Sequence, residues 1–335
     1  MGNGLKLFKE EPLSFVYEPL INPPISEMEE ENENLRVFSF KELKKATKNF
    51  SRDRVEIGED ISVRKFYKGY ITKTTFATSR TETGIAVYVV ECPKDRSQAQ
   101  QEWMDKVKKS LGQFSHPNLV KLLGYCCEDN KSLFLVFEYL HKGSLDRYIF
   151  GNEVLPWELR VNIAIGTAKG LAFIHSVKNS SVHLEIRMHK IMLDEQYNAK
   201  LFYCDLNQKC LVDEKGRVLA GGFGYVALEL AMTGHIGTEA DVYTFGVILL
   251  ELLTGLKAFD TERSDDKRSL AVWTKSYLSN KIGEIIDPRF GNDYPVNAAT
   301  QMGKLIKRCI AQDKNKRPLM QQVLDGLNDI AEMKD

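Results

Sequence analysis

The stretch DVYTFGVILLELLTG at residues 241–255 decides the fold that we expect for this chain. Apolar side chains occupy nearly every side of a helix drawn over residues 239–253, and a helix of this kind is buried inside a large domain. Thr238 and Asp241 have the spacing of a capping box at the start of the helix, and Gly255 is suited to end it. We therefore predict a buried central helix.

The sequence before this helix changes from strand patterns to helical patterns. Residues 85–90 form a β-branched apolar run without a polar face, which is typical of a strand buried on both sides, and residues 133–139 form a second apolar strand. Residues 98–111 have the spacing of an amphipathic helix, and a longer helix begins near Pro156 and reaches Ile174. This order predicts a strand-rich smaller part followed by a helical larger part.

Composition narrows the class of protein. The 335 residues carry 46 basic and 46 acidic side chains, so no overall charge favours nucleic acid as a partner. Residues 1–36 hold eight acidic and three basic side chains, and we expect a flexible acidic tail there, because such a segment cannot bury enough apolar surface to offset its ordering entropy. The six cysteines and six histidines lack metal-ligand spacing, so we assign no structural metal and expect reduced thiols in a cytosolic protein.

The amino terminus carries a candidate lipidation site. Residues 1–6 read MGNGLK, which resembles a myristoylation signal on Gly2, although Lys6 stands where Ser or Thr is usual. The longest apolar run, residues 245–253, is interrupted by Glu251 and is far shorter than the ~20 residues that a membrane span needs. We therefore expect no segment of the chain to cross a bilayer.

Four ordered motifs resemble one known family. They are FSFKELKKATKNF at 38–50, HPNLVKLLGYC at 116–126, DVYTFGVILLELLTG at 241–255 and IDPR at 286–289. Over about residues 37–330 the chain is similar to the protein kinase superfamily, and specifically to the plant receptor-like cytoplasmic kinases. The resemblance implies an α+β, two-lobed protein-kinase-like fold in residues 37–335. Its small β-rich lobe would cover about residues 37–138, and its larger helical lobe about residues 143–335.

The catalytic positions implied by this resemblance have lost their chemistry. Active protein kinases hold the motifs H-R-D…N and D-F-G, which supply a catalytic base and magnesium ligands. The matching positions here read His183-Leu184-Glu185, Lys190 and Tyr203-Cys204-Asp205. Lys190 and Tyr203 are not magnesium ligands, and Glu185 is one methylene longer than the catalytic aspartate. We expect no active catalytic residue and no magnesium site.

The implied nucleotide site is a remnant. Its loop begins with Ile57 and Gly58 but lacks the second and third glycines that let the backbone approach phosphates. The resemblance places the phosphate-binding lysine at Tyr88 and its glutamate partner at Lys106, so both halves of one ion pair have changed. Two readings stay open: independent drift after loss of activity, or a swapped cation in which Lys106 reaches the site from its helix. We expect ATP binding to be weak or absent.

Residues that support the fold are retained. Glu229 and Arg317 match a buried ion pair of the helical lobe, and Asp241 matches a residue that ties the catalytic loop to the central helix. Residues 205–223 contain no Ser, Thr or Tyr, so we expect no switching by phosphorylation of this segment.

These observations predict a pseudokinase that acts as an adaptor, scaffold or decoy in plant cytoplasmic and immune receptor signalling. The resemblance implies protein partners among active receptor-like kinases and intracellular immune receptors. It also implies a place in the cytoplasm, or on the inner face of the plasma membrane if Gly2 is acylated. Two alternatives stay open: a weak atypical serine/threonine kinase that uses Glu185 and Lys106 in unconventional roles, and a nucleotide-sensing module without turnover.

Overall fold

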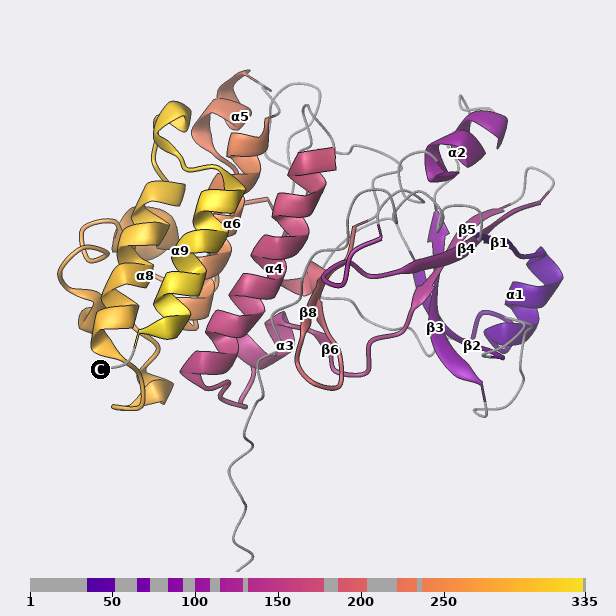
Figure 1. Ribbon diagram of the computed structural model, residues 1–335, viewed down its shortest axis with the longest axis horizontal. Coiled ribbons are helices and arrows are strands. Elements are labelled where there is room, and N and C mark those ends of the chain that lie inside the picture. The colour runs from indigo at the N-terminus through magenta and orange to yellow at the C-terminus, as the bar shows by residue number, and fades with distance from the viewer. Residues whose placement is uncertain are drawn as a thin grey trace, which may run out of the picture.

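The computed structural model places the chain in two lobes. It describes residues 35–51, 65–72, 84–92, 100–108, 115–128, 132–177, 186–203, 222–233 and 237–333. A strand-rich lobe and a larger helical lobe lie next to each other (Figure 1). The predicted two-lobed α+β architecture is therefore confirmed. Residues 1–34, most of the predicted tail, lie outside the described residues, and the predicted domain boundaries stay predictions.

The strand-rich lobe is built on a five-stranded sheet with the strand order β1-β4-β5-β3-β2. The strands are β1 (Arg36–Val37), β2 (Lys65–Ile71), β3 (Ile85–Cys92), β4 (Leu122–Glu128) and β5 (Ser132–Glu138). Neighbouring strands are antiparallel except β1, which pairs with β4 in parallel. The two strands predicted at 85–90 and 133–139 are confirmed as β3 and β5.

One helix covers each face of this sheet. On one face lies α1 (Phe40–Ala46), which begins with a capping box between Ser39 and Glu42; its buried Leu43 belongs to the same core cluster as Val87 and Val89. On the other face lies α2 (Gln100–Lys106), where Trp103 joins the main core. The outer ends of the helix predicted over residues 98–111 lie outside the described residues.

The helical lobe contains a small sheet and seven described α-helices, besides short 3₁₀ turns. Its three strands, in the order β6-β7-β8, are β6 (Gly143–Ser144), β7 (Ile191–Leu193) and β8 (Ala199–Leu201). Its helices are α3 (Asp146–Ile149), α4 (Trp157–Val177), α5 (Leu228–Thr233), α6 (Thr238–Thr254), α7 (Leu270–Thr274), α8 (Val296–Cys309) and α9 (Met320–Glu332). In the described part of the chain, no helix is long and apolar enough to cross a bilayer.

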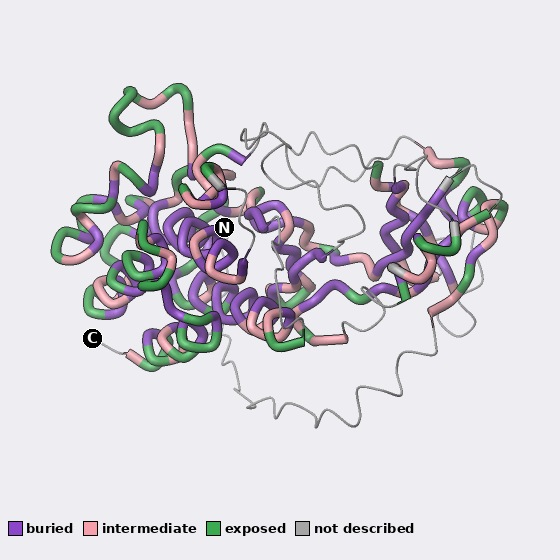
Figure 2. The backbone as a smooth tube through the Cα atoms, turned by 90° about the horizontal axis from the view of Figure 1, so that it is seen from above, coloured by how far each residue is buried: buried purple, intermediate pink, exposed green. Residues whose placement is uncertain are grey.

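Helix α6 is the buried central helix that the sequence predicts. Fourteen of its 17 residues are buried, and buried residues line the centre of both lobes (Figure 2). At Gly246 a Cβ atom would lie 2.6 Å from the Cβ of Cys309, so glycine permits the close approach of α6 and α8. Gly255 ends the helix with a φ of 69°, in the left-handed region that glycine adopts without strain.

The predicted capping box of α6 is wrong. The helix begins one residue earlier than expected, so Gly237 is the N-cap, and no side chain caps the helix. Thr238 therefore lies in the first turn, where its hydroxyl cannot act as an N-cap. The carboxylate of Asp241 lies instead 2.9 Å from Nε2 of His175 in α4, and Asp241 is fully buried.

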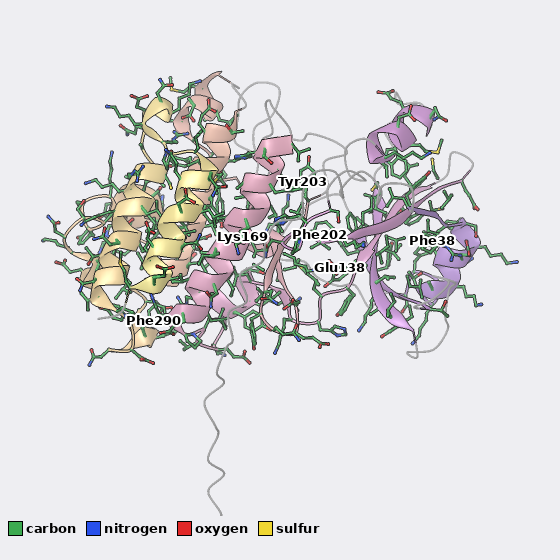
Figure 3. The ribbon with its side chains drawn as sticks, viewed as in Figure 1. Phe38, Glu138, Lys169, Phe202, Tyr203 and Phe290 are labelled. Carbon is green, nitrogen blue, oxygen red and sulfur yellow. The ribbon has the colours of Figure 1, made fainter. Side chains whose placement is uncertain are left out.

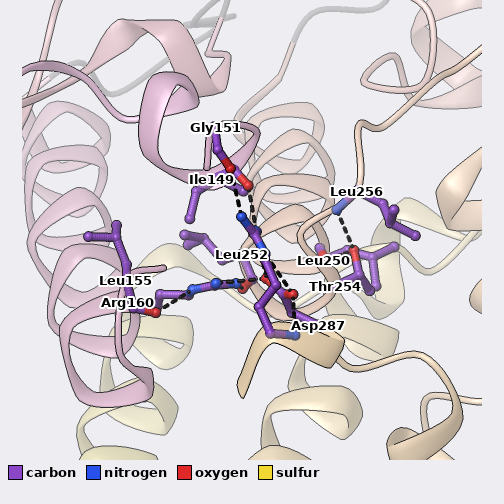
Figure 4. Close-up of polar contacts among 10 residues, drawn as sticks. Ile149, Gly151, Leu155, Arg160, Leu250, Leu252, Thr254, Leu256 and Asp287 are labelled. Atoms are coloured by element: carbon purple, nitrogen blue, oxygen red, sulfur yellow. Dashed lines mark hydrogen bonds and ion pairs between the residues drawn. The ribbon is translucent and has the colours of Figure 1, made fainter. Parts of the chain in front are cut away.

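A buried ionic network ties several of these helices together (Figure 4). Arg160 of α4 donates hydrogen bonds to the carbonyl of Leu252 in α6, at 2.8 Å, and to the carboxylate of Asp287, at 2.7 Å. Arg289 donates to the same carboxylate at 2.7 Å, and also to the carbonyls of Ile149 and Gly151. The IDPR motif thus links α3, α4 and α6 through a single carboxylate.

Candidate functional site: the cleft between the lobes

Strand β3 forms one wall of the candidate site. Its side chains alternate between two cores: Val87 and Val89 pack toward α1, whereas Tyr88, Val90 and Cys92 pack toward α2 and the helical lobe. Every described side chain on this inward face is uncharged. The strand therefore supplies no cation that could pair with the phosphates of a nucleotide, whichever inward position is considered.

Tyr88 is fully buried and reaches the segment that joins the lobes. Its hydroxyl donates a hydrogen bond of 3.3 Å to the carbonyl of Leu140, which also accepts one from the backbone N–H of Gly143 at 3.1 Å. Its ring centroid lies 4.6 Å from that of Tyr139. Burial raises the pKa of Tyr88 well above its ordinary value of 10, so the phenol stays neutral and keeps donating.

Lys68 brings a positive charge to the same wall, from a position that the sequence analysis missed. It stands opposite Tyr88 in the register of β2 and β3. Its ammonium lies 4.5 Å from the ring centroid of Tyr139 and 5.6 Å from that of Tyr70. Both distances suit cation–π contacts, so the faces of the two tyrosine rings attract and stabilise this ammonium group.

Aromatic and ionic contacts join the helical lobe to the sheet of the strand-rich lobe. Phe202 follows β8, and its ring centroid lies 4.8 Å from that of Phe137 in β5 and 5.7 Å from that of Phe66 in β2. Lys200 of β8 forms an ion pair of 2.7 Å with Glu138 of β5. Phe202 and Glu138 lie between the lobes in Figure 3. Side chains at the junction of the lobes thus hold β8 and the segment after it to β2 and β5.

Lys190 and Tyr203, which stand where the resemblance places the magnesium ligands of active kinases, lie in neighbouring segments. Lys190 ends a short 3₁₀ turn before β7, and its carbonyl accepts a hydrogen bond of 2.7 Å from the N–H of Phe202, next to the buried Tyr203. Magnesium needs hard oxygen ligands, usually carboxylates, and neither Lys190 nor Tyr203 carries a carboxylate. Within the described stretches, no group of three or more His, Cys, Asp or Glu side chains could hold a metal ion.

Other predicted site residues cannot be placed in this way. Glu185, Ile57, Gly58 and Gly2 lie outside the described residues. Lys106 is the last residue of α2, but its side chain also lies outside them, so the swapped-cation reading stays a prediction.

The predicted ion pair of the helical lobe is confirmed. Arg317 donates to both carboxylate oxygens of Glu229 in α5, at 2.5 and 2.9 Å, and to the carbonyls of Glu239 and Ala311. The guanidinium side chain is 1% exposed. Asp241 lies within hydrogen-bond distance of His175, and its predicted contact with the catalytic loop stays a prediction.

Comparisons with known proteins agree with this geometry. The family model described as protein tyrosine and serine/threonine kinase matches residues 56–327. Two proteins of Arabidopsis thaliana, inactive serine/threonine-protein kinases BKN2 and BKN1, are 60% and 59% identical over the whole of both chains. Receptor-like cytoplasmic kinase 176 of Oryza sativa subsp. japonica is 37% identical over 93% of this chain and 81% of its own. The predicted resemblance is confirmed, and two full-length relatives named as inactive support the prediction of an inactive homologue.

Proposed function

We propose that this chain, which belongs to the protein tyrosine and serine/threonine kinase family, is a pseudokinase whose fold serves as a protein-binding scaffold. One observation carries the proposal. The helical lobe keeps the pairs that buried Arg317 forms with Glu229 and buried Asp241 with His175, while the inward face of β3 has no cation and Lys190 and Tyr203 offer no carboxylate to magnesium. Selective retention of structural residues is expected when a fold provides a surface rather than a reaction.

Loss of nucleotide binding is part of this proposal. Kinases hold ATP through a lysine on β3 and through magnesium ions on carboxylate and amide side chains. Tyr88 and Val90 offer no charge, and Lys190 brings a cation to a place where a second cation would bind. ATP affinity should therefore be weak or absent.

The proposed partners are proteins: active receptor-like kinases or intracellular immune receptors, reached in the cytoplasm or at the inner face of the plasma membrane. Support comes from the similarity to receptor-like cytoplasmic kinases, and the role would be that of an adaptor, scaffold or decoy. No described contact favours the two alternatives, a weak kinase or a nucleotide sensor, over this role.

The proposed scaffold role is tested by measuring how well matched variants of the protein bind its partners. Partners are first captured from native tissue on the full-length protein and identified by mass spectrometry. Glu185→Ala should leave their binding intact, whereas Asp241→Asn should weaken it, because the change removes the charge that faces His175 inside the lobe. Asp325→Asn, on the exposed face of α9, is the control for loss of one carboxylate. Loss of signalling in the Glu185 variant alone, with the protein folded and bound, would refute the scaffold role.

A further inference from the structure

We infer that the phenol ring of Tyr88 fills the space beside Tyr139 and the carbonyl of Leu140, and so excludes planar heteroaromatic bases such as adenine from it. The inference rests on the proposed loss of nucleotide binding and assigns a physical cause to it. Loss of phosphate and metal contacts weakens binding of the triphosphate, but the base itself is excluded by a side chain of the protein.

The first step concerns hydrogen bonding. The carbonyl of Leu140 has two lone pairs, and it receives two donors, the hydroxyl of Tyr88 and the N–H of Gly143. An amino group of a base would need the position that the hydroxyl holds. Because burial raises the pKa of Tyr88 above its ordinary value of 10, the phenol keeps this proton near neutral pH and the donor stays in place.

The second step concerns the space around the ring. Tyr88 stands opposite Lys68 in β2 and Phe137 in β5, so its ring lies on the inward face between both neighbouring strands. The ring of Tyr139 is beside it, and the ammonium of Lys68 covers Tyr139 from the other strand. A ligand in place of the phenol would thus meet aromatic walls, one acceptor and a nearby cation, which suits a neutral planar base with an amino donor.

The third step separates this role from ordinary core packing. Any buried tyrosine stabilises its surroundings, so a loss of stability on substitution proves nothing about exclusion. A cavity that closes around adenine, however, requires both the vacated ring space and the free acceptor of Leu140. Phe38 offers a matched control, because it is buried to the same degree in the same lobe but packs on the opposite face of the sheet.

The experiment compares four full-length proteins: wild type, Tyr88→Ala, Tyr88→Phe and Phe38→Ala. Adenine is the probe, and its binding is measured by calorimetry and by the rise in melting temperature that any ligand of the native state produces. Tyr88→Ala should melt at a lower temperature than wild type and should bind adenine at least about tenfold more tightly. Tyr88→Phe should exclude adenine as the wild type does, because it keeps the ring.

Three results would overturn the inference. Adenine binding by wild type as tight as that by Tyr88→Ala would show that the ring excludes nothing. Equal binding by Phe38→Ala would show that any cavity in this lobe suffices, and a folded Tyr88→Ala protein without affinity would show that no pocket exists. Should Tyr88→Ala fail to fold, Tyr88→Val keeps the strand propensity of β3 and carries the same expectations. Magnesium-dependent binding of ATP by the wild type would instead refute the proposed function, so the two failures are distinguishable.

Discussion

Asp287→Asn should destabilise the helical lobe far more than the loss of an exposed carboxylate does. The side chain of Asp287 is 2% exposed, and that of its partner Arg160 is 3% exposed. Removing the negative charge leaves the guanidinium of Arg160 buried, with the carbonyls of Leu155 and Leu252 as its described partners. Breaking a buried pair in this way costs about 3–5 kcal/mol of unfolding free energy. An unfolding entropy of about 2.1 cal/mol/K per residue gives a shift of about 1.4 °C for each kcal/mol in a chain of 335 residues, so the melting temperature should fall by at least about 4 °C.

Asp265→Asn is the matched control for this prediction. Asp265 forms an ion pair of 2.9 Å with Arg268, but its side chain is 87% exposed, and pairs of this kind are worth roughly 0–1 kcal/mol. Urea unfolding at pH 7 can be followed by tryptophan fluorescence. The ring centroid of Trp157 lies 6.1 Å from that of Phe290, whose ring contacts the guanidinium of Arg160, so this tryptophan reports on the surroundings of the ion pair. Equal losses of stability in the two variants would refute the reasoning, since burial would then make no difference.

The effect of Asp287→Asn should also depend on pH. Burial alone would raise the pKa of Asp287, but hydrogen bonds from Arg289 and Arg160 outweigh it and hold the pKa below the ordinary value of 3.8. A carboxylate with a lowered pKa stabilises the folded state above the unfolded pKa and loses this contribution as the pH falls through the folded value. The gap between wild type and variant should therefore persist at pH 7 and narrow below about pH 4.

Three further experiments give distinct outcomes. Burial raises the pKa of Glu251 from 4.5 to about 8, so between these pH values the folded state keeps a proton that the unfolded state has released. The unfolding free energy of the wild type should therefore fall as the pH rises from 4.5 to about 8, and Glu251→Gln should reduce this fall in urea titrations. An unchanged pH dependence in the variant would exclude Glu251 as its source. If Gly2 carries a myristoyl chain, that chain alone holds the protein to the membrane only weakly and reversibly. Gly2→Ala removes the acceptor and should move the protein from membrane to soluble fractions, whereas an unchanged distribution would argue against acylation as the anchor. ATP with magnesium should leave the melting temperature of the wild type unchanged, and a large magnesium-dependent rise would contradict the reading of Lys190 and Tyr203.

Much of the fold could be predicted because it depends on local patterns. The central helix follows from apolar residues over 239–253, and Gly255 as its end follows from the special backbone freedom of glycine. The start of the helix was predicted wrongly, because Thr238 and Asp241 fit a capping box by spacing alone. The sequence does not show that Gly237 already caps the helix, or that Asp241 faces His175, 66 positions away.

The sequence alone could predict which charged residues the site lacks, but not which side chains fill their space. Comparing Tyr88 and Tyr203 with the kinase motifs shows that a lysine and an aspartate are missing, because this comparison needs only the residue identities. What fills the space depends on pairs that are distant in sequence, such as Phe137 with Phe202 or Lys68 with Tyr139. No spacing rule links such pairs, and only the register of the strands and the approach of the two lobes bring them together.

The claim that this kinase fold works without phosphoryl transfer is tested most directly by a transfer assay on the purified full-length protein. The assay uses radiolabelled ATP and generic protein substrates, with either magnesium or manganese, and compares the wild type with Glu185→Ala. Working kinases turn over about 1–100 times per second. We predict no transfer by the wild type above the level of the Glu185 variant. Turnover by the wild type that Glu185→Ala abolishes would contradict the claim and establish an enzyme.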